Sequence, residues 1–226
     1  MSWWLSRRPG VDVCIPYLII SELYANDLAD CKSLAPTWEK LAADFVSEPS
    51  VLIAKVDAEA ENAKATAQEQ EVSGYPTIKF FPKGSTTPET YSGGRNEDQL
   101  VEFVNSKAGT FRVAGGGLNS DAGTVEAIDT VLQKYVNANG IKDVEKATEE
   151  IKKAAQNIKD KSTEYYLKAL AKITGNPEYA MKEQTRLAGL LKKGGLAPEK
   201  VDDLQRRSNI LRKFLVKEDD EVKSEL

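Results

Sequence analysis

The stretch "NDLADCKSLAPTWEKLA", residues 26–42, places a lone cysteine at the start of an amphipathic segment. Apolar residues recur there at helical spacing and predict a helix with one buried face: Leu34, Trp38, Leu41 and Phe45. Cys31 would lie at the N-terminus of this helix, where the helix dipole and free N–H groups stabilise a thiolate. Redox enzymes use that place for a Cys-x-x-Cys pair, but Leu28 occupies the partner position. Cys31 therefore belongs to a redox site, to a damaged one, or to a core without thiol chemistry.

The composition is that of an ordinary globular chain of one or two domains. The 226 residues are 29% charged and 41% hydrophobic, and the net charge is −4. An acidic balance argues against general nucleic-acid binding, which needs a basic surface. Because no apolar run approaches the length of a bilayer, we expect no membrane span.

The chain has no histidine, which removes much catalytic chemistry. Ser-His-Asp and Cys-His hydrolysis are excluded, as are histidine-ligated zinc and iron sites. Cys14 and Cys31 cannot form a structural zinc site alone, and they are too far apart for a Cys-x-x-Cys motif. Cys14 is interpreted as a small hydrophobic residue rather than a substitute thiol.

Outward from this stretch, the first half alternates strand and helix patterns. Apolar runs predict four strands: 17–24, 50–57, 76–84 and 89–94. Helical patterns begin at Cys31 and cover 60–72 and 96–109, with Asn96 as an N-cap and Gly109 just past the helix end. This order predicts an α/β sandwich with a mixed sheet.

The segment "AGGGLNSDAG", residues 114–123, is the clearest linker, because consecutive glycines are unfavourable in helices and strands. Strand signals vanish after it, and five helical patterns follow: 121–137, 143–159, 162–174, 177–193 and 198–215. The second half is therefore expected to be a small helical bundle, without strands beyond residue 118. The predicted organisation is an N-terminal segment, an α/β domain, a linker, a helical domain and a charged tail: 1–16, 17–113, 114–119, 120–215 and 216–226.

Four stretches of the first half resemble the thioredoxin fold of the protein disulfide-isomerase family: "CKSLAPTWEKLA", "VLIAKVDAE", "VSGYPTIKFFPKG" and "YSGGRNEDQLVEFVN". The second half is similar to the helical C-terminal domain of some endoplasmic-reticulum thioredoxin-like proteins, through "STEYYLKALAKI", "NPEYAMKEQTRLAGLL" and "KVDDLQRRSNIL". The resemblance implies a thioredoxin-like α/β sandwich followed by a small all-α bundle. Residues 1–16 match nothing in the family, so the sandwich is expected to be N-terminally incomplete.

The resemblance also assigns roles near Cys31. The family's active-site strand, approximately Val-Glu-Phe-Tyr-Ala-Pro-Trp-Cys-Gly-His-Cys, aligns without gaps with "SELYANDLADC", residues 21–31. Cys31 then matches the resolving cysteine, Leu28 the nucleophile position and Glu22 the buried proton-relay glutamate. Arg95 matches an arginine that can approach the resolving cysteine and help it ionise. In the alternative interpretation, Glu22 is an outward-facing charge and Arg95 a solvated loop charge.

Client binding is implied for Tyr75, Pro76 and Thr77, with a cis peptide bond before Pro76 that faces the active site. Pro76 is otherwise an ordinary proline at the start of a strand. In the helical half, one aromatic and apolar group either forms core or lines a peptide groove: Tyr165, Tyr166, Leu167 and Tyr179.

Two departures from the family pattern, Leu28 and Asp30, weaken thiol–disulfide exchange. Exchange begins when a thiolate attacks a disulfide, and the side chain of Leu28 cannot do this. Asp30 disfavours a thiolate at Cys31, where the family's histidine favours it. We therefore expect thiol–disulfide exchange to be impaired in this chain.

Both ends of the chain carry possible targeting signals. Lys223, Ser224, Glu225 and Leu226 differ from the Lys-Asp-Glu-Leu retrieval signal only at Ser224, although a charged tail is the alternative. The N-terminus is a poor signal peptide, because arginines follow its first apolar residues and Asp12 interrupts the run. A retrieval signal without a signal peptide is a conflict, and the active-site strand is altered in the same N-terminal region. An alternative or misassigned first exon is a hypothesis that explains both.

The favoured interpretation is a protein-folding factor of the endoplasmic-reticulum lumen from the disulfide-isomerase family. The resemblance implies thiol–disulfide exchange in client proteins, a reaction that needs no metal or organic cofactor. Its partners would be unfolded or disulfide-containing client proteins, and the sequence does not determine its oligomeric state. The alternative is a redox-inert chaperone or peptide-binding module, which Leu28 favours, so the assignment as an enzyme stays open. A cytosolic thioredoxin-like adaptor is a third interpretation.

Overall fold

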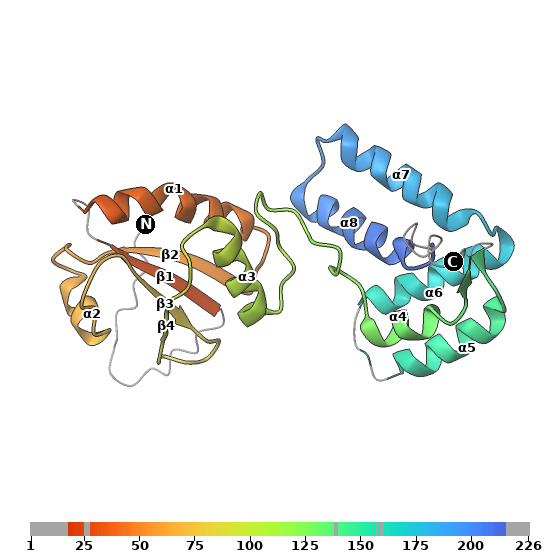
Figure 1. Ribbon diagram of the computed structural model, residues 1–226, viewed down its shortest axis with the longest axis horizontal. Helices are drawn as coiled ribbons and strands as arrows, with labels where there is room; N and C mark the ends of the chain where they lie inside the picture. The colour runs from red at the N-terminus through yellow and green to blue at the C-terminus, as the bar shows by residue number, and fades with distance from the viewer. Residues whose placement is uncertain (1–17, 25–27, 138–139, 157, 159–160, 216–226) are drawn as a thin grey trace, which may run out of the picture. The chain divides into compact units, whose positions relative to one another are not determined.

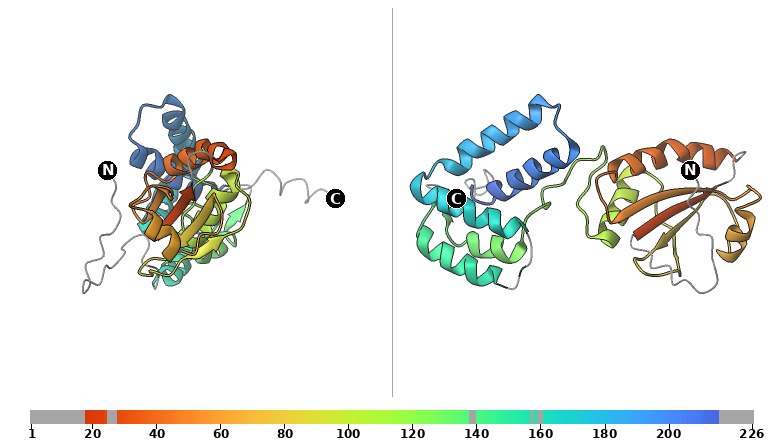
Figure 2. Two further views of the ribbon diagram at one scale, coloured as in Figure 1. Left: turned by 90° about the vertical axis from the view of Figure 1, so that its left-hand side faces the viewer. Right: turned by 180° about the vertical axis from the view of Figure 1, so that it is seen from behind.

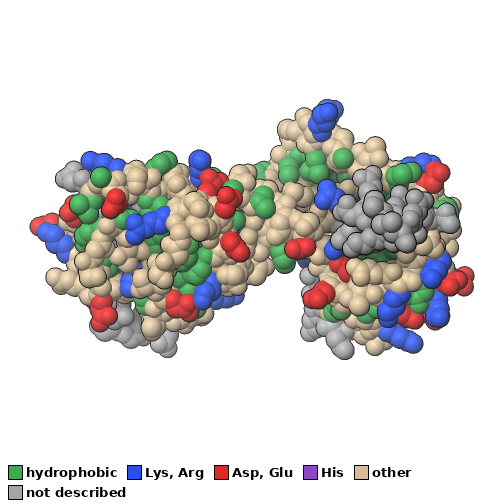
Figure 3. All heavy atoms as spheres, viewed as in Figure 1, with side chains coloured by type: hydrophobic (Ala, Val, Ile, Leu, Met, Phe, Trp, Pro, Cys, Tyr) green, Lys and Arg blue, Asp and Glu red, His purple; other side chains and the backbone are tan. Residues whose placement is uncertain are grey.

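The computed structural model describes residues 18–24 (backbone only), 28–137, 140–156, 158 and 161–215. The chain divides into two compact units between Gly117 and Leu118, and each is described by itself. On the face shown in Figure 3, basic and acidic side chains are interspersed over both units, as the small net charge suggests.

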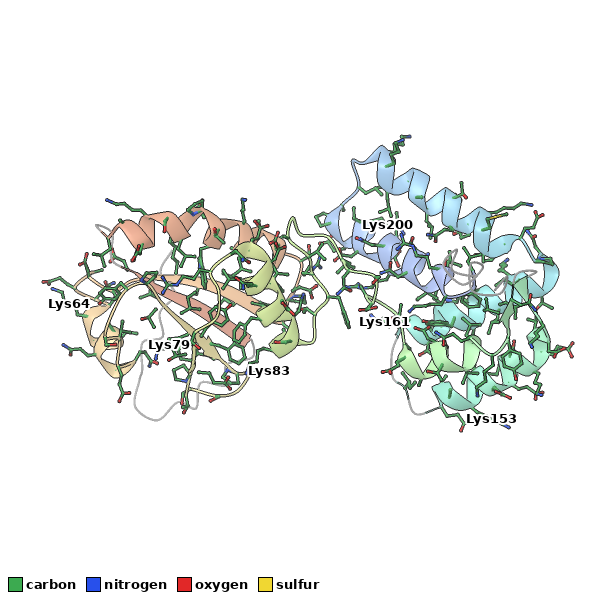
Figure 4. All side chains as sticks on the ribbon, viewed as in Figure 1. Lys64, Lys79, Lys83, Lys153, Lys161 and Lys200 are labelled. Carbon is green, nitrogen blue, oxygen red and sulfur yellow. The ribbon has the colours of Figure 1, made fainter. Side chains whose placement is uncertain are left out.

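The first unit contains a mixed four-stranded sheet in the order β2-β1-β3-β4 (Figure 1). The strands are β1 (Leu18–Tyr24), β2 (Val51–Asp57), β3 (Thr77–Phe81) and β4 (Glu89–Tyr91). β1 runs parallel to β2 and antiparallel to β3, and β3 runs antiparallel to β4. Lys79 of β3, labelled in Figure 4, donates from Nζ to Thr90 Oγ1 of β4 at 2.8 Å. The mixed sheet predicted from the sequence is confirmed.

Two helices share one core with the sheet: α1 (Ala29–Asp44) and α3 (Glu97–Ala108). The C-terminal part of α1 lies beside α3 in both Figure 1 and Figure 2. The predicted apolar face of α1 is buried in full: Leu34, Trp38, Leu41 and Phe45. Trp38 also donates from Nε1 to the carbonyl of Ala54 at 3.0 Å, which ties α1 to β2.

Local capping signals set the ends of α3 as expected. The Asn96 side chain accepts the N–H of Gln99 at 2.9 Å, and so satisfies one of the free donors of the first turn. Gly109 ends the helix with φ of 66°, a left-handed conformation that glycine adopts without steric cost. Both predictions are confirmed.

The predicted helix 60–72 is shorter in the structure, as α2 (Lys64–Glu69). Residues 60–63 form hydrogen-bonded turns instead, with the N–H of Ala63 bonded to the carbonyl of Ala60 at 2.8 Å. Glu71, with φ of 52°, leaves the helical conformation just beyond the other end. Ala67 is the buried residue of α2, so packing stabilises only its middle.

Five helices form the described part of the second unit: α4 (Glu126–Leu132), α5 (Val144–Ala155), α6 (Lys161–Gly175), α7 (Tyr179–Lys193) and α8 (Pro198–Arg212). Their core contains fully buried residues from all five: Ile128, Leu132, Ile151, Tyr166, Leu170, Leu187 and Leu211. The helical bundle that the sequence predicted is therefore present.

The expectation of no strand beyond residue 118 was wrong. β5 (Val136–Asn137) pairs antiparallel with β6 (Gly140–Ile141), and α4 ends at Leu132 rather than near residue 137. Gly140 has φ of 103°, a backbone conformation that glycine adopts without steric cost, and Val136 and Ile141 pack against the helical core. In the sequence, "NANG", residues 137–140, separates two helical patterns, and strands of two residues are too short to show an alternating pattern.

Candidate functional site

The candidate site begins at the N-terminus of α1. Leu28 is the N-cap of the helix and is 45% exposed, whereas Cys31, in the first turn, is only 4% exposed. Cys31 follows the same helical period as Leu34 and Trp38, so its side chain points into the core of the unit. Asp30 is exposed beside it. The structure therefore exposes an apolar side chain at position 28 and shields the thiol of Cys31 from solvent.

The second part of the site is the loop before β3. The Tyr75–Pro76 peptide bond is cis, as the resemblance implied, and Pro76 is buried. Thr77 donates from Oγ1 to the carbonyl of Gly74 at 2.6 Å, which closes the loop on itself. Tyr75 packs against a small cluster that includes Val56 of β2. The loop is held from the sheet side and by its own hydrogen bonds.

Arg95 lies against this loop. Its Nη2 donates to the carbonyl of Pro76 at 3.0 Å, although the residue itself is exposed. The structure thus brings Arg95 and Pro76 together.

Glu22 lies in β1, between the two neighbouring strands of the sheet. Its Cα is opposite Lys55 of β2 and Ile78 of β3. Its expected role as a proton-relay group depends on the side chain, which lies outside the described atoms. Cys14 and the four residues of the retrieval signal, Lys223 to Leu226, also lie outside the described residues.

The aromatic group of the second unit belongs to the core. Tyr166 is fully buried, and Tyr165, Leu167 and Tyr179 pack against the same cluster. Burial raises the pKa of Tyr165 well above its ordinary value, and the nearby Tyr179 raises it further. This arrangement favours the core interpretation over a peptide groove.

Within the described residues, no group of three or more acidic, cysteine or histidine side chains is placed to hold a metal. In that same part of the chain, no helix combines the length and the apolarity that crossing a bilayer requires.

Two family models match the chain. The model described as thioredoxin matches residues 16–106, and the model described as the C-terminal domain of endoplasmic reticulum protein ERp29 matches residues 123–214. The fold and these matches define a thioredoxin-domain protein with an ERp29-type helical domain.

Named relatives share both parts. The chain is 54% identical over 197 residues to protein disulfide-isomerase erp38 of Neurospora crassa, covering 87% of this chain and 53% of that protein. It is 57% identical over 196 residues to protein disulfide-isomerase tigA of Aspergillus niger, covering 87% of this chain and 52% of that protein. The chain thus spans about half the length of the curated relatives it matches. Over both of its parts, the chain is similar to proteins of the protein disulfide-isomerase family.

Proposed function

We propose that this chain is a client-binding protein-folding factor of the disulfide-isomerase family in which the family reaction, thiol–disulfide exchange, is strongly impaired. The matched relatives are named protein disulfide-isomerases, which supports the reaction class. The observation that carries the impairment is the first turn of α1, where Leu28 is exposed and Cys31 is buried. Exchange requires an accessible thiolate, and neither residue supplies one.

The chemistry that would be lost is specific. In the family reaction, the first thiolate attacks a client disulfide and forms a mixed disulfide, releasing one client sulfur as a thiolate. The second cysteine then attacks the mixed disulfide, releases the client as a dithiol and leaves an oxidised active-site pair. With leucine at position 28 the first bond cannot form, and a buried Cys31 has no mixed disulfide to resolve.

The test is an insulin-reduction assay on the unmodified chain and on variants at the first turn of α1. The triple variant Leu28→Cys, Ala29→Gly, Asp30→His restores an exposed thiol at the helix N-cap and removes the neighbouring carboxylate. We expect activity near background for the unmodified chain and at least a tenfold increase for the triple variant. The single Leu28→Cys variant should gain less, because Asp30 raises the pKa of the new thiol.

The matched control is Leu28→Ser, which changes the size and polarity at the same position without adding a thiol. It should stay at background, and Cys31→Ser in the unmodified chain should change little. Strong insulin reduction by the unmodified chain, lost on Cys31→Ser, would refute the proposal and make Cys31 a single-thiol nucleophile.

A second candidate function is a redox-inert client-binding module. The exposed side chain of Leu28 favours it, because an apolar residue at a helix N-cap contributes no capping hydrogen bond and is free to contact a client. This second function is measured as the suppression of aggregation of a reduced, unfolded client. If the module binds through Leu28, suppression should fall on Leu28→Ser, whereas equal suppression by the unmodified chain and Leu28→Ser would exclude this side chain as the contact.

We infer that the protein works in the lumen of the endoplasmic reticulum. The ERp29 description of the second family model and the Lys-Ser-Glu-Leu end of the sequence support this. With a functional signal peptide fused to it, the chain should be retained, and deletion of residues 223–226 should cause secretion. Equal secretion of both forms would show that these residues are only a charged tail.

A further inference from the structure

The second unit contains an open cavity of about 830 Å³, at the end of the unit where α5 begins and α6 ends (Figure 1). Ligand sites in proteins have volumes of about 300–1,000 Å³, so the cavity has room for several side chains of a partner. Four apolar residues line it: Ile141, Val144, Ile173 and Pro177. Ile173 is only 4% exposed and belongs to the core of the unit, so the apolar lining is held in place from below.

Three carboxylates and one ammonium group line the same cavity: Asp143, Glu145, Glu149 and Lys146. All four residues are exposed. Asp143 is the N-cap of α5, but its side chain accepts no capping hydrogen bond, so helix capping does not use this carboxylate. The cavity therefore combines an apolar lining with an excess of negative charge.

The three carboxylates differ from most others in the unit. Six acidic side chains of the unit form ion pairs with lysine or arginine: Asp129, Glu150, Glu164, Glu178, Glu183 and Asp203. Within the described part of the chain, the carboxylates that line the cavity form no such pair. The cavity thus holds negative charges that the unit itself leaves without a counter-charge.

Helix stability does not account for this arrangement. Glu145 and Glu149 are four residues apart on one face of α5, a spacing at which like charges destabilise a helix. The positive end of the α5 dipole favours Glu145, which lies in the first turn, but its influence fades before Glu149. The C-terminal end of α6, which lines the cavity through Thr174, adds partial negative charge from its own dipole.

The combination of surfaces selects one kind of ligand. Arginine and lysine side chains place an apolar stem on an apolar surface while the charged head reaches a polar rim. In this cavity, the stem would lie on Val144 and Ile173, and the head would meet Glu145 or Glu149. An arginine head can also bind a carboxylate through two parallel hydrogen bonds. A neighbouring aliphatic side chain would cover the remaining apolar lining.

We propose that this cavity, here called the acidic groove, binds an extended peptide segment of a partner protein in which arginine or lysine alternates with aliphatic residues. The acidic groove belongs to the second unit. It does not depend on the proposed function, which rests on the first turn of α1, and it stands or falls by a different measurement.

The test is a methyl NMR titration of the full chain with the peptide Gly-Ser-Leu-Arg-Ile-Arg-Ser-Gly. The methyl groups of Ile141, Val144 and Ile173 should show the largest shifts, and these shifts should saturate. The absence of saturable shifts at millimolar peptide would overturn the proposal, and so would larger shifts elsewhere in the chain.

Two control peptides separate the charged from the apolar contribution. A peptide with both arginines replaced by glutamine should bind about tenfold more weakly, because two ion pairs are lost. A peptide with leucine and isoleucine replaced by serine should also bind about tenfold more weakly, because less apolar surface is buried. Undiminished binding of either control peptide would contradict a groove that uses both surfaces.

A pair of matched double variants tests the site itself. Glu145→Gln with Glu149→Gln should weaken binding of the first peptide about fivefold. Glu126→Gln with Glu199→Gln removes two exposed carboxylates of the same unit outside the groove and should leave binding unchanged. Equal weakening by both double variants would mean general attraction to an acidic unit and refute the groove. The peptide series uses the unmodified chain, so it decides the proposal even where a variant misfolds.

Discussion

The ion pair between Arg112 and Glu48 is a buried contact of the first unit. The two side chains are 2% and 12% exposed, and they meet at 2.7 Å. Replacing Arg112 by Met keeps the apolar length of the side chain and removes the charge. Glu48 is then left as a nearly buried carboxylate without its counter-charge, a situation that costs about 3–5 kcal/mol. The carbonyl of Gly116 also loses a donor.

Urea unfolding monitored by tryptophan fluorescence measures this loss. Trp38 is buried in the first unit, and the other two tryptophans, Trp3 and Trp4, lie outside the described residues. In a Trp3→Phe, Trp4→Phe background, the buried Trp38 is the only reporter. Since a domain loses about 1–3 kcal/mol of unfolding free energy per molar urea, Arg112→Met should lower the midpoint by roughly 2 M.

Two controls test the reasoning. Combining Arg112→Met with Glu48→Gln removes the unpaired charge, so the double variant should recover at least half of the lost stability. Lys64→Met removes a solvent-exposed partner of Glu61, a 3.8 Å surface pair, and should cost less than about 1 kcal/mol. A cost for Arg112→Met as small as that for Lys64→Met would show that Glu48 is solvated and refute the burial argument.

Two further predictions concern the helical unit. Tyr166→Phe removes the hydroxyl that donates to the buried Asp129 carboxylate and accepts the N–H of Val125 at 3.3 Å. Thermal or urea unfolding, followed by circular dichroism at 222 nm, should show a loss of about 1–3 kcal/mol in the free energy of unfolding. An unchanged transition would mean that water replaces the hydroxyl. Burial, and then the Glu150 carboxylate, raise the pKa of Tyr135 from 10.0 to about 12. The protonated hydroxyl therefore contributes its full stabilisation below pH 10, and this contribution is lost as the pH rises through about 12. Tyr135→Phe should flatten this alkaline loss relative to the unmodified chain, and an identical pH profile for both would contradict the assignment.

Much of the fold could be predicted because it depends on local chemistry. The helical period of Leu34, Trp38 and Leu41 predicted the buried face of α1, since the period of a helix decides which side chains share a face. Asn96 and Gly109 predicted the ends of α3, because capping involves only neighbouring residues. The cis bond at Pro76 came from the family resemblance and not from such a pattern.

The candidate site was predicted only in part. The helical period placed Cys31 on the buried face of α1, whereas its position at a helix N-terminus indicated thiol reactivity, and the structure favours burial. The contact between Arg95 and Pro76 joins residues 19 positions apart, and no local sequence pattern predicts it. The hairpin of β5 and β6 was missed because strands of two residues are too short to show an alternating pattern.

By itself, the sequence determined which chemistry is impossible in this chain: no histidine is present, and no thiol stands at position 28. Only the tertiary structure decided which charges meet. Arg112 pairs with Glu48, 64 residues away, and Asp44 comes to the same cavity as Glu97, because α1, α3 and the following loop pack together. Burial and distance set the energy of a charge, and both arise only when distant parts of the chain are brought into contact.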